Sequence, residues 1–148
     1  MNVGVVLIDC WEPPAWKRWV NYLYKNIEQQ IQQTKPVAVI NASYGDATKS
    51  AYLKKYVTHT VNSFDEFVSL AQELNTSTWI CMGRDWQICV HNNAVGLLSL
   101  QRANMTVICT VGTCSKSSGE FVSHEDFLND TLSWIPRNDR EYQLGANK

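Results

Sequence analysis

The sequence has no excess of charge of either sign. Its 13 basic and 14 acidic side chains leave a formal net charge of -1 over 148 residues, whereas proteins that bind nucleic acid usually carry a basic face. We interpret the local basic cluster of Lys49, Lys54 and Lys55 as a solvated surface. The composition therefore predicts that no nucleic acid is among the partners of this protein.

Long hydrophobic runs are also absent. No segment approaches the roughly 18 consecutive apolar residues that a membrane-spanning helix needs. The N-terminal stretch MNVGVVLIDCWEPP has no basic residue before its apolar run and ends that run in an aspartate, which favours a first strand over a signal peptide. We expect no membrane association, and we expect residues 1–148 to form one domain.

The spacings of cysteine and histidine that mark a metal site are missing as well. The five cysteines include no CxxC pair, and the three histidines are widely scattered. We therefore expect no metal site and no cofactor. An odd number of cysteines without a secretion signal indicates reduced thiols and a cytoplasmic location.

What the chain does contain is an alternation of strand and helix patterns. Continuous apolar runs rich in valine and isoleucine predict five strands that are covered on both faces, at residues 3–9, 36–42, 56–61, 77–83 and 105–112. Apolar residues at helical spacing predict four helices, at residues 13–31, 63–74, 86–103 and 123–135. Residues 43–55 fit either a short helix or a loop, and the polar tail 136–148 is expected to order only against a partner subunit.

This order of elements predicts a three-layer α/β/α, Rossmann-like fold with a five-stranded, mainly parallel sheet. Ligands bind such sheets at the carboxyl ends of the strands, where the strand order reverses. The order 3-2-1-4-5 would bring Asp9 and Trp11 toward the segment from Gly83 to Cys89. A flavodoxin-like order would bring Asp9 toward His59 instead, so Asp9 lies at the rim of the site in both cases.

Two side chains at this rim are candidates for chemistry. Asp9 ends an apolar strand, where a carboxylate is unfavourable unless it is paired or solvated, and it fits either a general base or a turn former. Cys89 is expected in the first turn of a helix, where free N–H groups favour a thiolate, although free cysteines are often simply buried. Cys81 and Cys109 are expected in the core, and Cys10 and Cys114 at the rim.

Other residues near this rim fit more than one role. Arg84 and Asp85 fit a surface ion pair, or Arg84 could bind a substrate carboxylate. His59 fits either the core or the pocket.

The segments VVLID, ending in Asp9, and ICMGRDWQICV, which contains Gly83 and Cys89, resemble the isochorismatase-like cysteine hydrolases. Family members carry an LLVIDMQ strand with an aspartate and a VxxGVxTxxCV segment with the nucleophilic cysteine. The resemblance implies that Asp9 activates Cys89 and that the Arg84–Asp85 peptide is cis. It further implies that a neighbouring N–H, together with that of Cys89, forms an oxyanion hole, and that the protein is a homo-oligomer.

The chain departs from the family pattern at the third strand, where family members carry a catalytic lysine. The corresponding segment reads YVTHTVNSF, so His59 or Thr60 occupies that place or the triad is broken. The DxHxxxH metal motif of the nicotinamidases also has no counterpart, which implies no zinc or iron. Arg84 and Trp86 replace small or polar residues, which implies a pocket suited to an anionic or flat ligand.

The resemblance therefore implies a hydrolase that acts on a small amide or a related carbonyl or vinyl-ether substrate through Cys89 and Asp9. Trp11, His59 and Trp86 would contact the substrate. The alternative is a catalytically impaired protein of the same fold that binds a small ligand or serves as an assembly module. A redox role for Cys89 is a third hypothesis.

Overall fold

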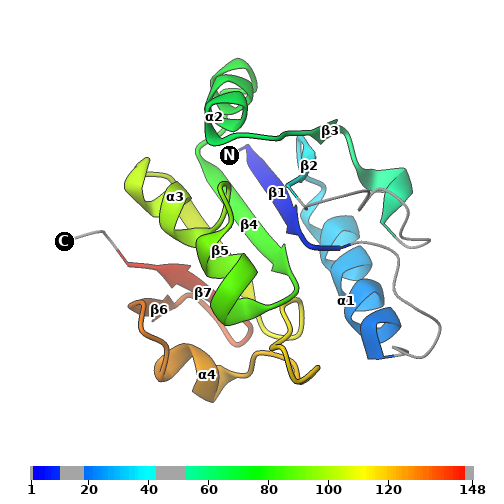
Figure 1. Cartoon of the computed structure of the whole chain (residues 1–148), viewed down its shortest axis with the longest axis vertical. Coiled ribbons are helices and arrows are strands. Elements are labelled where there is room, and N and C mark those ends of the chain that lie inside the picture. The colour runs from blue at the N-terminus through cyan, green and yellow to red at the C-terminus, as the bar shows by residue number, and fades with distance from the viewer. Residues whose placement is uncertain (1, 11–18, 43–52, 146–148) are drawn as a thin grey trace.

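A computed structural model of the chain describes residues 2–10, 19–42 and 53–145 (Figure 1). One mixed, mostly parallel sheet of seven strands runs through it, in the order β3-β2-β1-β4-β5-β7-β6. The strands are β1 (Val3–Ile8), β2 (Val39–Asn41), β3 (His59–Thr60), β4 (Thr78–Gly83), β5 (Thr106–Thr110), β6 (Trp134–Pro136) and β7 (Glu141–Leu144). The first five strands are parallel to one another, whereas β7 is antiparallel to both β5 and β6.

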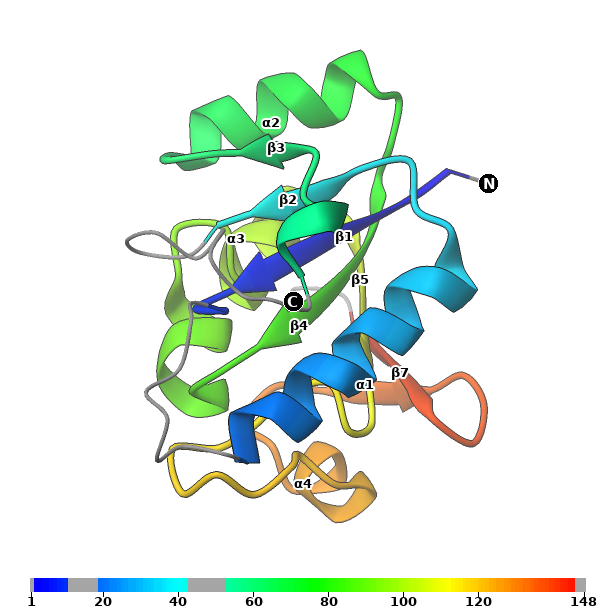
Figure 2. The same cartoon turned by 90° about the vertical axis from the view of Figure 1, so that its right-hand side faces the viewer.

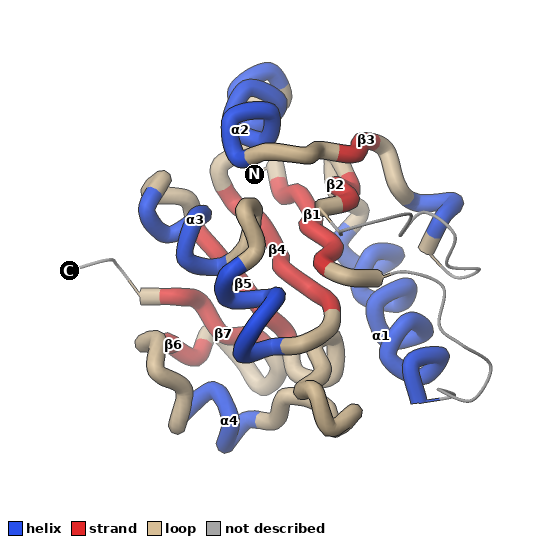
Figure 3. Tube along the Cα trace, in the orientation of Figure 1, coloured by secondary structure: helices blue, strands red, loops and turns tan. Residues whose placement is uncertain are grey.

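Helices cover both faces of this sheet, as Figures 2 and 3 show. They are α1 (Trp19–Thr34), the 3₁₀ turn η2 (Lys54–Tyr56), α2 (Phe64–Glu73), the π-helical turn η3 (Trp86–Val90), α3 (Leu97–Arg102) and α4 (His124–Leu128). None of these helices is long and apolar enough to cross a lipid bilayer. The expected α/β class is confirmed.

The core has two apolar layers because successive strand residues point to opposite faces. Val5 and Leu7 of β1 pack toward α1 and its buried residues Leu23 and Ile27. Val6 and Ile8 belong to the other layer, with side chains from α2, α3 and α4. Burial on both faces explains why β1 and β4 read as continuous apolar runs rather than as alternating ones.

The sheet has two more strands than the sequence predicts. The expected helix at 123–135 ends at Leu128, and residues 134–136 and 141–144 are strands rather than parts of a helix and of a polar tail. Tyr142 and Leu144 are buried and alternate with half-buried Glu141 and Gln143. This is the period-two pattern of a half-covered strand. The Tyr142 ring also stacks on Phe127 at 4.4 Å.

The expected continuous helix from residue 86 to 103 is also wrong, because it breaks between η3 and α3. The Asn93 side chain donates to the carbonyl of Ala42 at 3.0 Å and accepts from the Val95 N–H at 2.9 Å. A Cβ at Gly96 would lie 2.6 Å from the Val90 carbonyl oxygen. The side chain of Asn93 and the glycine thus hold a turn between the two helical segments.

Candidate functional site

The site lies where β1 and β4 end side by side. The two strands are parallel, and Ile8 is in register with Gly83. The Arg84 N–H donates to the Ile8 carbonyl at 3.1 Å, so the chain beyond Gly83 stays close to the chain beyond Ile8. Gly83 has a φ of 148°, and a Cβ there would lie 2.0 Å from the Ile8 oxygen. Only glycine permits this close approach.

Both aspartates of the site have left-handed backbone conformations, with φ 55° at Asp9 and 59° at Asp85. Aspartate and asparagine tolerate this conformation better than most residues other than glycine. The Asp85 carbonyl accepts the N–H groups of Ile88 at 3.0 Å, Cys89 at 2.8 Å and Val90 at 3.2 Å. These three bonds form the tight turn η3, which brings the Cys89 side chain back over the strand ends.

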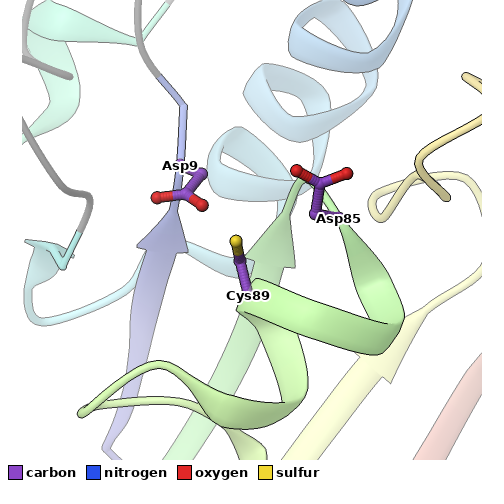
Figure 4. A group of neighbouring side chains, drawn as sticks. All are labelled: Asp9, Asp85 and Cys89. Carbon is purple, nitrogen blue, oxygen red and sulfur yellow. The ribbon is translucent and has the colours of Figure 1, made fainter.

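The side chains of Asp9, Asp85 and Cys89 meet at this point (Figure 4). One carboxylate oxygen of each aspartate and the Cys89 sulfur all lie within 4.8 Å of one another. Asp9 is buried, with 1% of its surface exposed, whereas Asp85 and Cys89 are half-buried. The Cys89 sulfur thus lies within 4.8 Å of a carboxylate oxygen of Asp9, and the interaction with this carboxylate raises the pKa of the thiol. A proton acceptor therefore lies directly against the candidate nucleophile.

The surroundings of Cys89 disfavour its thiolate in the resting protein. Burial, the interaction with Asp9 and the charges of Asp9 and Asp85 raise the pKa of the Cys89 thiol to about 12, while the charge of Arg84 acts in the opposite direction. The thiol is therefore protonated at neutral pH, so attack on a substrate needs a base at that moment.

The Cys89 N–H, which is expected in an oxyanion hole, is bonded within the protein. The Cys89 N–H is bonded to the Asp85 carbonyl, the Arg84 N–H to that of Ile8 and the Gly83 N–H to that of Thr113. No cis peptide bond occurs in the described residues, so the expectation of one between Arg84 and Asp85 is wrong. The left-handed conformation of Asp85 turns the chain there instead.

Arg84 is buried, with 6% of its surface exposed, which excludes a surface ion pair. Its guanidinium carbon lies 5.4 Å from the centre of the Trp19 ring, an arrangement typical of a cation–π contact. Arg84 is the positive group that acts on the Cys89 thiol. Its charge therefore opposes the effect of the two carboxylates on this thiol.

The three residues expected to contact the substrate, Trp11, His59 and Trp86, differ in their surroundings. Trp86 is 2% exposed and packs against Trp134 at 5.6 Å and Phe127 at 5.3 Å, so it belongs to an aromatic cluster of the core. His59 is exposed on β3, which β2 separates from β1, and its Nδ1 pairs with the Thr58 hydroxyl at 2.8 Å. Trp11 lies outside the described residues.

Of the five cysteines, Cys89 is the one that is half-buried. Cys81 and Cys109 lie in the core as expected, and Cys10 and Cys114 are equally buried rather than at an accessible rim. The Cys114 thiol points inward and donates to the Cys81 carbonyl at 3.6 Å. Accessibility thus separates Cys89 from the other four thiols.

For Asp85 the sequence predicts only a surface ion pair with Arg84 and a place in the peptide beside the oxyanion hole, not a carboxylate next to Cys89. Its position four residues before Cys89 was the available signal, because a tight helical turn brings such residues to one side. Two carboxylates and a thiol are also donor types that bind divalent cations, so these three residues could hold a metal ion. The expectation of no metal rests on a missing motif and stays a prediction.

Pockets elsewhere in the described residues do not contain this cluster. One of about 610 Å³ lies beside α1 and the β6–β7 turn, lined in part by Gln30, Thr34, Arg137 and Arg140. Another of about 330 Å³ is lined in part by Trp86, His91 and Asp130.

Comparison of the chain with protein-family models, with curated proteins and with solved structures gives no match.

Proposed function

We propose that the protein is an isochorismatase-like cysteine hydrolase that acts on a small amide or a related carbonyl or vinyl-ether substrate. The observation that supports this proposal is the position of the Asp9 carboxylate, within 4.8 Å of the Cys89 sulfur at the paired ends of β1 and β4. A nucleophile within hydrogen-bond reach of its base is the arrangement that covalent catalysis requires.

For an amide, Asp9 accepts the thiol proton while the sulfur bonds to the carbonyl carbon, and the C=O π electrons move to oxygen. The tetrahedral intermediate then re-forms the C=O bond and breaks the C–N bond, and the amine leaves with the proton that Asp9 returns. Water next attacks the thioester while Asp9 accepts its proton. The C–S bond breaks, the carboxylic acid leaves, and the thiol regains its proton.

Arg84 is the residue that we propose to stabilise the negative oxygen of the intermediate. Its charge already acts on the Cys89 sulfur, and a fixed positive charge in a buried environment stabilises developing negative charge more strongly than one in water. This role replaces the oxyanion hole of backbone N–H groups that the sequence resemblance implies.

The alternative is a catalytically impaired protein of the same class that binds a small ligand or serves as an assembly module. Two observations favour it: the pKa of the Cys89 thiol is raised to about 12, and the Cys89 N–H is bonded to the Asp85 carbonyl. For either function we propose a cytoplasmic location and a homo-oligomeric state. Light scattering of the purified protein tests the oligomeric state.

A panel of small amides and esters, assayed against wild-type protein and a Cys89→Ser variant, separates the two functions. The hydrolase proposal predicts turnover of at least one compound and its loss in the variant. Saturable binding of panel compounds without product, in both proteins, would support the alternative and contradict the hydrolase.

A further inference from the structure

The carboxylate of Asp85 lies next to the candidate nucleophile, within 4.8 Å of the Cys89 sulfur. It makes no hydrogen bond and no ion pair with any residue in the described part of the chain. It is nevertheless half-buried, and Figure 4 places it across from Asp9 with the Cys89 sulfur pointing between them. A half-buried carboxylate without a hydrogen bond or ion pair is unfavourable unless another molecule supplies a partner.

The position of this carboxylate is fixed by the backbone rather than by side-chain bonds. Asp85 has a left-handed conformation, with φ 59° and ψ 62°, and its carbonyl accepts three N–H groups of η3. This backbone conformation is unfavourable for residues with a side chain and persists only where the surroundings impose it. The turn thus holds the carboxylate near the Cys89 sulfur and limits its freedom to move into solvent.

Among the described residues, negative groups outnumber positive ones in their action on the Cys89 sulfur. Asp9 and Asp85 both act on the Cys89 thiol, and Arg84 is the one positive group that acts on it among the described residues. Arg84 is buried beside the Trp19 ring, whereas Asp85 remains half-exposed to an incoming molecule. Asp9 is buried as well, so among the described residues Asp85 is the most accessible of the charged groups that act on the sulfur.

We propose that Asp85 is a specificity-determining residue that binds a positively charged group, an ammonium or a guanidinium, of the substrate. This inference rests on the proposed hydrolase function and names its substrate class: a small carbonyl compound with a cation within a few atoms of the scissile bond. The short distance, at most 4.8 Å between the sulfur and the Asp85 oxygen, requires this closeness. Substrates with a carboxylate at that position are repelled by both aspartates.

Thiol reagents of fixed charge test this inference without knowledge of the substrate. Three methanethiosulfonates carry a trimethylammonium-ethyl, a methyl or a sulfonatoethyl group. In each reaction the Cys89 sulfur bonds to the sulfenyl sulfur, and methanesulfinate leaves. Rates at Cys89 are measured at pH 9 by mass spectrometry of the peptides, in the presence of a chelator, and are divided by the rates with free mercaptoethanol. The ratio of the cationic to the anionic rate does not depend on the fraction of thiolate, because both reagents meet the same thiol.

The wild-type ratio is expected to exceed one by about tenfold or more, and Asp85→Asn is expected to lower it by about tenfold, since one charge near 5 Å is removed from a partly solvated site. Asparagine also tolerates the left-handed conformation, so the turn is kept. Asp139→Asn, at an exposed position in the β6–β7 turn, removes the same charge elsewhere and should leave the ratio unchanged.

A wild-type ratio near one, or a ratio that Asp85→Asn leaves intact, would overturn the inference while the hydrolase proposal stands. Failure of all three reagents to modify Cys89 would overturn both.

Discussion

Replacement of Asp9 by asparagine should change the chemistry of Cys89 in two opposite directions. In the resting protein the interaction with the Asp9 carboxylate helps to raise the pKa of Cys89 to about 12. Loss of this charge therefore lowers the pKa of the thiol and increases the fraction of thiolate at a given pH. During turnover, however, the same carboxylate is the base, so its loss should slow hydrolysis.

Both effects have an expected size. A charge within about 4–6 Å shifts a pKa by about 1–3 units. Each unit gives about tenfold more thiolate, but intrinsic nucleophilicity falls about threefold, so alkylation should accelerate roughly 3- to 30-fold. Loss of a general base should lower kcat/KM by about 10²–10⁴-fold. Asparagine tolerates the left-handed φ of 55° at this position, so the changes report on charge rather than on the turn.

The assay pairs the second-order rate of iodoacetamide modification of Cys89 at pH 8 with kcat/KM for an amide substrate of the panel. Cys89→Ser should abolish both signals, and Asp139→Asn should leave both near wild type. Slower alkylation in Asp9→Asn would show that Asp9 promotes the resting thiolate, which contradicts the electrostatic reasoning. Unchanged turnover would show that Asp9 is not the base.

Three further predictions test the electrostatics and the frame of the site. The alkylation rate of Cys89 should keep rising about tenfold per pH unit above pH 9, where an ordinary thiol levels off, because its pKa is raised to about 12; a plateau near pH 9 would contradict this. Gly83→Ala should destabilise the fold by at least about 2 kcal/mol in urea unfolding, because the new Cβ would lie 2.0 Å from the Ile8 oxygen. A change in the unfolding free energy below about 0.5 kcal/mol would refute this close approach. The His91 and Trp134 side chains lower the pKa of Asp130. The ionised Asp130 carboxylate therefore stabilises the fold above the pKa that Asp130 has in the unfolded chain. This stabilisation is lost as the pH falls through the lower pKa that Asp130 has in the folded protein. Asp130→Asn should therefore reduce the fall of the unfolding free energy at acid pH. An unchanged slope of this free energy against pH would contradict the interaction of Asp130 with His91 and Trp134.

The sequence predicts the α/β class and the meeting of Asp9 with Cys89 because both follow from local patterns. Continuous apolar runs mark β1 and β4, and parallel strands that lie side by side place their carboxyl ends together. The short β7 was missed because its alternation covers only four residues. Such a pattern is visible only once the partner strand β5 and the Phe127 ring are known.

Two features of the site depend on contacts that no local pattern encodes. The break between η3 and α3 depends on Asn93, whose amide reaches the Ala42 carbonyl 51 residues away in the chain. The raised pKa of Cys89 depends on burial and on two carboxylates from different strand ends. A helix-start argument considers only the N–H groups of the cysteine's own helix, and it therefore predicts a thiolate where burial and the two carboxylates favour the thiol.

Detection of an acyl-enzyme tests most directly whether Cys89 and Asp9 form a nucleophile and base. Wild-type protein is mixed with a reactive p-nitrophenyl ester, quenched in acid at short times and analysed by intact-mass and peptide mass spectrometry. The hydrolase proposal predicts a transient acyl group on Cys89 that forms and decays at the rate of turnover and is absent in Cys89→Ser. Turnover that persists in Cys89→Ser, or an acyl group that never forms on Cys89, would contradict it.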